Sequence, residues 1–72
     1  MKRGVINYSV TWQEDGSEHE EIYFSKFNAV ARYMEIIMEC NYYVSCLRIW
    51  EIYRSLNRPM ADITDRVNRF LA

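Results

Sequence analysis

The sequence has few of the residues that build most catalytic and metal sites. Its 72 residues include one histidine, two glycines, one proline and two cysteines. With glycine only at positions 4 and 16, no glycine-rich phosphate-binding loop can form. Neither a CxxC nor an HxxxH pattern occurs, so the common zinc-ligand spacings are missing. We therefore predict that the protein is not an enzyme and holds no metal or cofactor.

Long hydrophobic runs are also absent. No segment approaches the roughly 20 apolar residues of a membrane span, and no apolar stretch follows the basic residues near the start, as a secretory signal would require. Cys40 and Cys46 are too few for a disulfide framework. We expect one at a helix end and the other in a strand, both as buried thiols in a reducing compartment. These features favour a cytoplasmic protein.

The composition indicates a single globular domain covering residues 1–72. Half of the residues are hydrophobic and 15% are aromatic. A core this small supplies only about 3–5 kcal/mol, so dimerisation is the natural source of further stability. The net charge of −1 hides an asymmetry: residues 1–39 carry four basic and seven acidic side chains, and residues 40–72 carry five arginines and three acids. We expect a homodimer whose subunits have two charged poles.

The first third of the chain predicts a β-hairpin. Residues 5–12 alternate between apolar and polar side chains, as a half-buried strand does. Asp15 and Gly16 mark the turn, and the second strand covers roughly residues 18–24. A three-residue loop would pair Tyr8 with Ile22 and match apolar side chains across the strands. We prefer that register to the one set by a two-residue loop.

Ser25 is the expected N-cap of a helix that runs to about Cys40. Its stripe at helical spacing is expected to face the core: Phe27, Val30, Ala31, Met34, Ile37 and Met38. A second stripe lies beside it and must find another partner: Ala29, Tyr33, Ile36 and Cys40.

The C-terminal half predicts a strand and a helix. Residues 42–53 form a third strand that is apolar on both faces, so we expect both faces to be covered. Pro59 suits the first turn of a final helix over residues 59–71. The expected fold is therefore α+β, with the topology ββαβα and a three-stranded antiparallel sheet in the order 2-1-3. One helix lies on a face of the sheet, and the C-terminal helix covers the other face or mediates dimerisation.

The segment E-D-G-S-E-H-E-E, residues 14–21, is the first candidate binding site. Side chains alternate along a strand, so His19 and its acidic neighbours cannot converge on a metal ion. The acids could instead meet a basic protein partner by charge complementarity, unless they only keep a turn soluble. The candidate contact residues are Glu14, Asp15, Glu18, Glu20 and Glu21.

Two other surfaces are alternatives. A hydrophobic docking surface or dimer interface could form around Tyr33, Ile36, Tyr43 and Tyr53. Arginines and aromatics also interleave in the C-terminal half and could hold single-stranded nucleic acid: Tyr42, Tyr43, Arg48, Trp50, Tyr53, Arg54 and Arg58. The net charge of −1 argues against direct nucleic-acid binding. We interpret these aromatics as core and interface residues.

Three segments carry a resemblance to a known group of proteins: V-I-N-Y-S-V-T-W-Q-E-D-G-S, F-N-A-V-A-R-Y-M-E and Y-V-S-C-L-R-I-W-E. In style and in their β-β-α-β layout, they resemble small early proteins of bacteriophages. The resemblance implies a protein in the host cytoplasm that binds and inhibits a host protein, in some cases a basic nucleic-acid-binding protein that is occupied by DNA mimicry. No residue roles follow from it. The sequence thus predicts a non-enzymatic, homodimeric protein-binding module, with nucleic-acid binding as the alternative.

Overall fold

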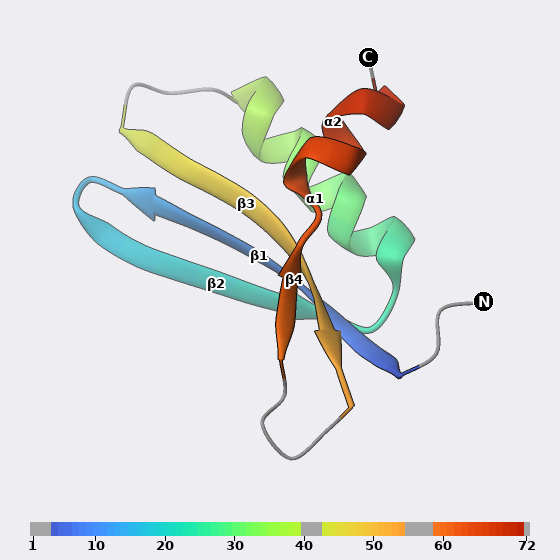
Figure 1. Ribbon diagram of the computed structural model, residues 1–72. Helices are drawn as coiled ribbons and strands as arrows, with labels where there is room; N and C mark the ends of the chain where they lie inside the picture. The colour runs from blue at the N-terminus through green and yellow to red at the C-terminus, as the bar shows by residue number, and fades with distance from the viewer. Residues whose placement is uncertain (1–3, 40–42, 55–58, 72) are drawn as a thin grey trace.

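A computed structural model describes residues 4–39, 43–54 and 59–71. The elements follow the order β1 (Val5–Glu14), β2 (Ser17–Tyr23), α1 (Lys26–Glu39), β3 (Val44–Tyr53), β4 (Met60–Asp62) and α2 (Thr64–Leu71) (Figure 1). The strands form one antiparallel sheet in the order β2-β1-β3-β4. The predicted α+β class, with an antiparallel sheet and two helices, is confirmed.

The predicted number of strands is wrong, because β4 lies where the sequence predicts the start of the final helix. Met60 pairs with Ile52, and Asp62 pairs with Trp50, so these residues extend the sheet at the edge of β3. The helix begins only at Thr64, whose backbone N–H donates a 2.9 Å hydrogen bond to the Asp62 carboxylate. Pairing with β3 therefore replaces the first helical turn. Residues 55–58 lie outside the described part of the chain.

The hairpin turn has two residues, so the predicted three-residue loop is wrong. Asp15 and Gly16 both have positive φ, 53° and 82°. Such a turn matches the right-handed twist of the two strands. It pairs Tyr8 with Tyr23. Ile22, predicted to pair with Tyr8, therefore lies on the sheet face away from the core and is 51% exposed.

The start of α1 is confirmed, but its core-facing stripe is the opposite of the predicted one. The backbone N–H of Asn28 donates to the Ser25 hydroxyl, as an N-cap requires. The buried residues of this helix are Ala29, Tyr33 and Ile36, from the second stripe. Helical periodicity shows that both stripes are apolar, but it does not show which of them is buried. The buried stripe is the one whose Tyr33 hydroxyl reaches Asn68 of α2.

A β-bulge changes the faces of β3. Thr11 pairs with Arg48 but Gln13 pairs with Ser45, so two β3 residues lie opposite one residue of β1. Cys46 takes a left-handed conformation there, with φ at 54°. The bulge therefore brings Val44, which would share a face with Cys46 and Trp50 in a regular strand, to the core. It also leaves Cys46 exposed, so the prediction of a buried thiol is wrong. Cys40 lies outside the described residues.

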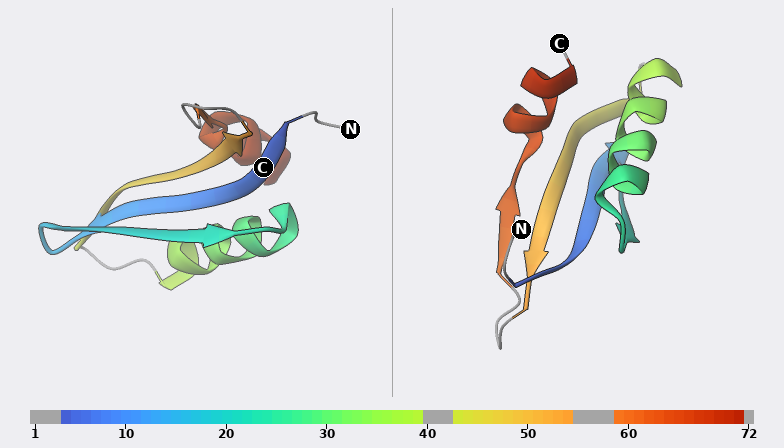
Figure 2. Two further views of the ribbon diagram at one scale, coloured as in Figure 1. Left: turned by 90° about the horizontal axis from the view of Figure 1, so that it is seen from below. Right: turned by 90° about the vertical axis from the view of Figure 1, so that its right-hand side faces the viewer.

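Helix α2 begins at the edge of β3 and packs against α1 (Figure 2). The Tyr33 hydroxyl of α1 donates a 2.6 Å hydrogen bond to the Asn68 side chain of α2. The prediction that the final helix covers the other sheet face is therefore wrong. The core gathers side chains from the sheet, α1, and α2 with the residue before it: Val10, Trp12, Ala29, Tyr33, Ile36, Ile49, Ile63 and Val67.

Candidate functional site

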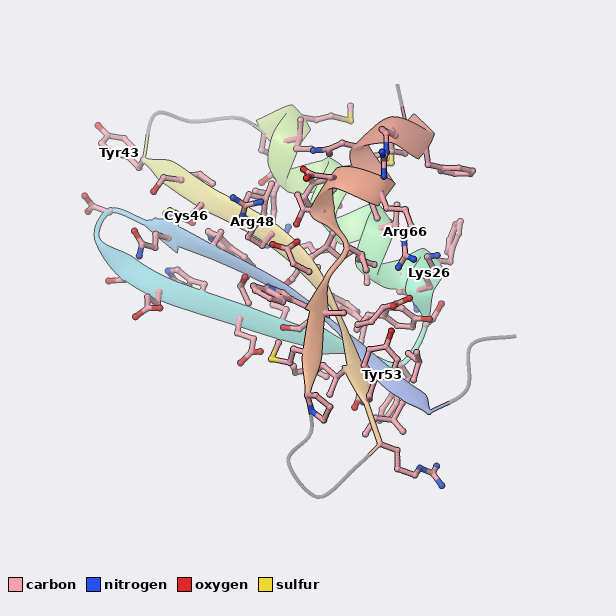
Figure 3. All side chains as sticks on the ribbon, viewed as in Figure 1. Lys26, Tyr43, Cys46, Arg48, Tyr53 and Arg66 are labelled. Atoms are coloured by element: carbon pink, nitrogen blue, oxygen red, sulfur yellow. The ribbon has the colours of Figure 1, made fainter. Side chains whose placement is uncertain are left out.

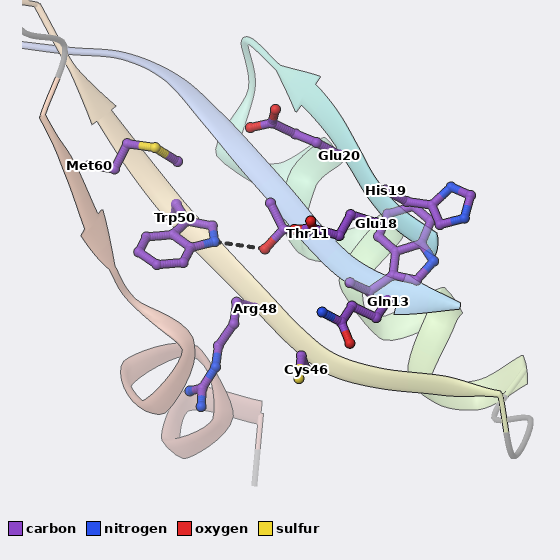
Figure 4. A pocket seen from close by; sticks show the side chains of 10 residues that line it. Thr11, Gln13, Glu18, His19, Glu20, Cys46, Arg48, Trp50 and Met60 are labelled. Atoms are coloured by element: carbon purple, nitrogen blue, oxygen red, sulfur yellow. Dashed lines mark hydrogen bonds between the residues drawn. The ribbon is translucent and has the colours of Figure 1, made fainter. Parts of the chain in front are cut away.

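The acids of the hairpin do not form one surface. Glu18 and Glu20 are exposed on the sheet face away from α1 (Figure 4). Glu21 lies on the α1 side, where it accepts a 2.8 Å hydrogen bond from Arg32. Glu14 accepts a hydrogen bond from the Trp12 indole, and Asp15 belongs to the turn. Of the five predicted contact residues, the fold brings only Glu18 and Glu20 to the same uncovered face.

That face, called the open face below, carries polar, charged and aromatic side chains from all four strands: Thr11, Gln13, Glu18, Glu20, Cys46, Arg48, Trp50 and Met60 (Figure 4). With Trp12 and His19, they line a shallow hollow of about 660 Å³. The Trp50 indole donates a 2.8 Å hydrogen bond to Thr11, and the Ser9 hydroxyl donates a 2.7 Å bond to Glu20. These bonds hold the hollow in a defined shape.

The arginines and aromatics of the nucleic-acid hypothesis are spread over the molecule. Arg48 and Trp50 lie on the open face, but Arg48 pairs with Asp62 at 3.6 Å and shares that face with two glutamates. Tyr53 donates a hydrogen bond to the buried Glu51 instead of facing solvent as a stacking platform. Tyr42 and Arg58 lie outside the described residues. A continuous basic, aromatic surface is therefore not formed by the described part of β3.

A cluster around Arg32 ties β2 to α1. Its guanidinium bonds Glu21 and also Glu35, at 2.6 Å, and lies 5.6 Å from the centre of the Trp12 ring. His19 also stacks on Trp12, with ring centroids 5.3 Å apart. Sequence reasoning missed this stack because Trp12 and His19 pair only in the register of the two-residue turn.

The same cluster shifts the pKa values of Glu21, Tyr23 and Arg32. Burial raises the pKa of Glu21, but hydrogen bonds from Tyr23 and Arg32 and the Arg32 charge outweigh burial and hold that pKa below its usual value. Burial and the hydrogen bond to Glu21 raise the pKa of Tyr23. The bonds to Glu21 and Glu35 raise the pKa of Arg32. Glu21, Tyr23 and Arg32 are thus held in their ordinary charge states at neutral pH, which suits a structural cluster.

A buried carboxylate lies on the core side of β3. Glu51 is 1% exposed and accepts a 2.8 Å hydrogen bond from Tyr53. Arg66 of α2 approaches its other oxygen at 3.2 Å. Burial and the Glu51 charge raise the pKa of Tyr8, which faces Glu51 from β1. The guanidinium compensates for the buried charge, so this network joins α2 to the sheet.

Six of the ten large hydrophobic side chains that are exposed in the described part of the chain lie on the helices. We call this set the helical surface, and it consists of Phe27, Met34, Ile37 and Met38 of α1 with Phe70 and Leu71 of α2. Phe27, Met38 and Phe70 are each at least 80% exposed. An apolar groove of about 500 Å³ runs between the helices at one end. It is lined by Lys26, Phe27, Val30, Arg66, Val67 and Phe70. Sequence reasoning found the α1 residues but assigned them to the core.

The predicted docking residues are separated by the fold. Tyr33 and Ile36 are 3% and 5% exposed, so they belong to the core of the subunit and are not accessible to a partner. Tyr43 is 64% exposed at the start of β3, and Tyr53 lies half-buried at its end. These four residues do not form one surface, because Tyr33 and Ile36 are buried with the second α1 stripe.

Comparison with models of known protein families, with curated proteins and with solved structures found no match to this chain. The resemblance to phage early proteins therefore stays a prediction. Neither α1 nor α2, the helices of the described chain, is long and apolar enough to cross a membrane.

Proposed function

We propose that the chain is a non-enzymatic protein-binding module whose main contact area is the helical surface. The observation that carries this proposal is the exposure of six large apolar side chains on two adjacent helices. Apolar areas of this kind on small domains mark interaction sites, because leaving them in water costs roughly 25 cal/mol per Å². Methionines suit such a role, since their flexible thioethers adapt to a partner.

The proposal is tested by substituting the helical surface and comparing what the protein binds. Phe27→Glu combined with Met38→Glu is expected to abolish binding of the partners captured by the wild type, whether these are further copies of the chain or other proteins. Phe24→Glu is the matched control, because Phe24 is 87% exposed but lies outside the helical surface. Circular dichroism checks that all variants fold. Capture that survives the helical substitutions and is lost in the control would contradict the proposal.

The open face supports a second candidate, the binding of a basic host protein of the kind that the phage resemblance implies. Glu18 and Glu20 are both exposed there, and same-face strand residues lie roughly 6.5–7 Å apart. That spacing is comparable to the separation of successive phosphates along a nucleic-acid strand, which is the basis of the DNA-mimic hypothesis. The two carboxylates border the hollow, so a basic side chain could reach both them and Trp50.

Salt-dependent binding to poly-lysine tests this second candidate. Glu18→Lys is expected to weaken it strongly, whereas Asp65→Lys, which changes the net charge equally at an exposed acid on α2, is the control. Equal loss in both variants would show that only the overall charge matters. Salt-sensitive binding of single-stranded oligonucleotides that depends on Arg48 would instead favour the nucleic-acid alternative.

A further inference from the structure

The outer side of α1 carries a seam of four exposed side chains. Phe27, Ala31, Met34 and Met38 follow the spacing i, i+4, i+7 and i+11, which is the alternating four-and-three spacing of a coiled-coil interface. The residues that face the sheet, Ala29, Tyr33 and Ile36, lie on the opposite side of the helix. A helix that is already packed against a sheet thus presents a second, complete packing face to solvent.

We infer that this seam is covered by the α1 helix of a second copy of the chain, running antiparallel about a two-fold axis. The inference rests on the proposed function, since it names the partner of the helical surface. The arrangement would stack two sheets outside a central pair of helices and would leave both open faces free. A C2 interface must be self-complementary, so the seam has to match itself when it is reversed.

The spacing of the seam meets that condition. When two copies are reversed about the point midway between Ala31 and Met34, Phe27 lies opposite the partner's Met38, and Ala31 lies opposite the partner's Met34. Each layer then pairs a larger side chain with a smaller or more flexible one. The small Ala31 leaves room for the partner's Met34 near the axis, as interdigitated packing requires.

The charges of α1 select the antiparallel direction. Helix N-termini favour negative charges and C-termini favour positive ones. Yet α1 has no acid in its first turn and no basic residue in its last. It begins with Lys26 and ends with Glu39, so both charges oppose its own dipole. An antiparallel partner brings Glu39 to the end that holds Lys26, and the opposed dipoles attract. A parallel partner would place like charges at both ends.

The groove between the helices gives the partner's chain end a place to pack. Lys26 and Arg66 lie at the same end of the two helices (Figure 3), and they border the groove lined by Phe27, Val30, Val67 and Phe70. In the antiparallel register, the partner's Ile37 and Met38 arrive at this groove. The same contact occurs twice in the dimer, by symmetry.

Sedimentation velocity tests the inference at micromolar protein concentration. The wild type is expected to be a dimer. Met34→Glu should weaken dimerisation by at least about tenfold, because it places two like charges beside the axis. Phe24→Glu, outside the seam, should dimerise like the wild type. A monomeric wild type, or a Met34→Glu variant that dimerises normally, would overturn the inference.

Disulfide trapping tests the direction in a background with Cys40→Ser and Cys46→Ser. A mixture of Phe27→Cys and Met38→Cys proteins is expected to give the mixed disulfide, whereas a parallel pair would give only the two symmetric ones and overturn the register. The outcome also separates this inference from the proposed function. If the wild type is a monomer and Met34→Glu abolishes its binding of a different captured protein, the dimer is refuted and the proposed function stands. If the wild type is a monomer and its helical surface binds no protein, both the dimer and the proposed function are refuted.

Discussion

The guanidinium of Arg66 in α2 lies 3.2 Å from the carboxylate of Glu51, a β3 side chain that is 1% exposed. The pair joins the last helix of the chain to a central strand. Removing one member of such a pair leaves a buried charge with less compensation, whereas removing both can cost little. This asymmetry makes the contact testable.

We expect Arg66→Met to destabilise the fold by about 1–3 kcal/mol, because the buried Glu51 carboxylate loses its cationic partner. The half-exposed position of Arg66 keeps the effect below that of a fully buried pair. In a Glu51→Gln background, the same substitution should cost much less. Urea unfolding of the two single variants and the double variant, at one fixed protein concentration, measures the coupling between the two residues. Arg69→Met is the control. Equal costs in both backgrounds would mean that the pair contributes no coupling.

At the edge of β3, Thr64 supplies a hydrogen-bond acceptor that a neighbouring strand would otherwise supply. Its hydroxyl accepts a 3.0 Å hydrogen bond from the backbone N–H of Ile49, and both residues are buried. The isosteric change Thr64→Val removes that acceptor, so we expect a loss of about 1–3 kcal/mol in the free energy of unfolding. Thr64→Ser retains the hydroxyl and should lose less. Hydrogen exchange of the Ile49 amide should speed up only in the valine variant.

The two-residue turn makes Gly16 the sensitive position of the hairpin. Its φ is 82°, and nothing lies within 4 Å of the place that a Cβ atom would occupy, so an added methyl group would be strained by backbone conformation and not by a clash. Gly16→Ala should cost about 1–2 kcal/mol. Asp15→Asn should be close to neutral, since asparagine also suits this turn position. Thermal unfolding of the two variants gives the comparison; a neutral Gly16→Ala would argue for a different turn.

The backbone conformation at the β3 bulge predicts that one substitution there stabilises the fold. Cys46 is exposed and has φ at 54°, a conformation in which glycine avoids a steric cost of about 1–2 kcal/mol. Cys46→Gly should therefore raise the free energy of unfolding, even after the extra entropy of the unfolded glycine is subtracted. Ser45→Gly, next to it but without positive φ, should lower it. Both values come from urea unfolding, and a loss in Cys46→Gly equal to that in Ser45→Gly would contradict the bulge.

The lowered pKa of Glu21 makes part of the stability depend on pH. Its carboxylate contributes stability that is fully present above the unfolded value near 4.5 and is lost as pH falls through the lower folded pKa. Asp62 acts in the same direction, because hydrogen bonds from Thr64 and the Arg48 charge outweigh the effect of burial on its pKa. Glu21→Gln should therefore flatten the acid limb of a stability-against-pH curve. Urea unfolding across this pH range gives the curve, and an acid limb equally steep in Glu21→Gln and in the wild type would contradict this assignment.

Patterns within short segments of the sequence correctly predicted the first strand and the start of the first helix. The alternation of residues 5–12 lies within β1, and the Ser25 cap begins α1 as expected. Turn chemistry at Asp15-Gly16 identified the hairpin but not its register. We chose the loop length that matched apolar residues across the strands. The chain instead takes the turn whose backbone twist suits the strands, and exposes Ile22.

The candidate surfaces were predicted less well, because exposure depends on contacts between distant residues. The acids of residues 14–21 were found, and strand alternation places Glu21 opposite Glu18 and Glu20. Only the fold shows that Arg32 of α1 bonds Glu21 and that no helix covers Glu18 and Glu20. The apolar residues of α1 were all recognised, but their stripes were exchanged. Nothing local shows that Tyr33 will bond Asn68, which is 35 residues away.

By itself, the sequence determined the α+β class, the antiparallel hairpin, the start of α1 and the scarcity of residues for catalysis or metal binding. These features follow from side-chain periodicity, capping and composition, which act over a few neighbouring residues. Only the tertiary structure decided the fourth strand, the β3 bulge, the position of α2 and the stripe of α1 that stays in solvent. Each of these results from competition between alternative packings of similar local cost, and contacts between distant segments settle that competition.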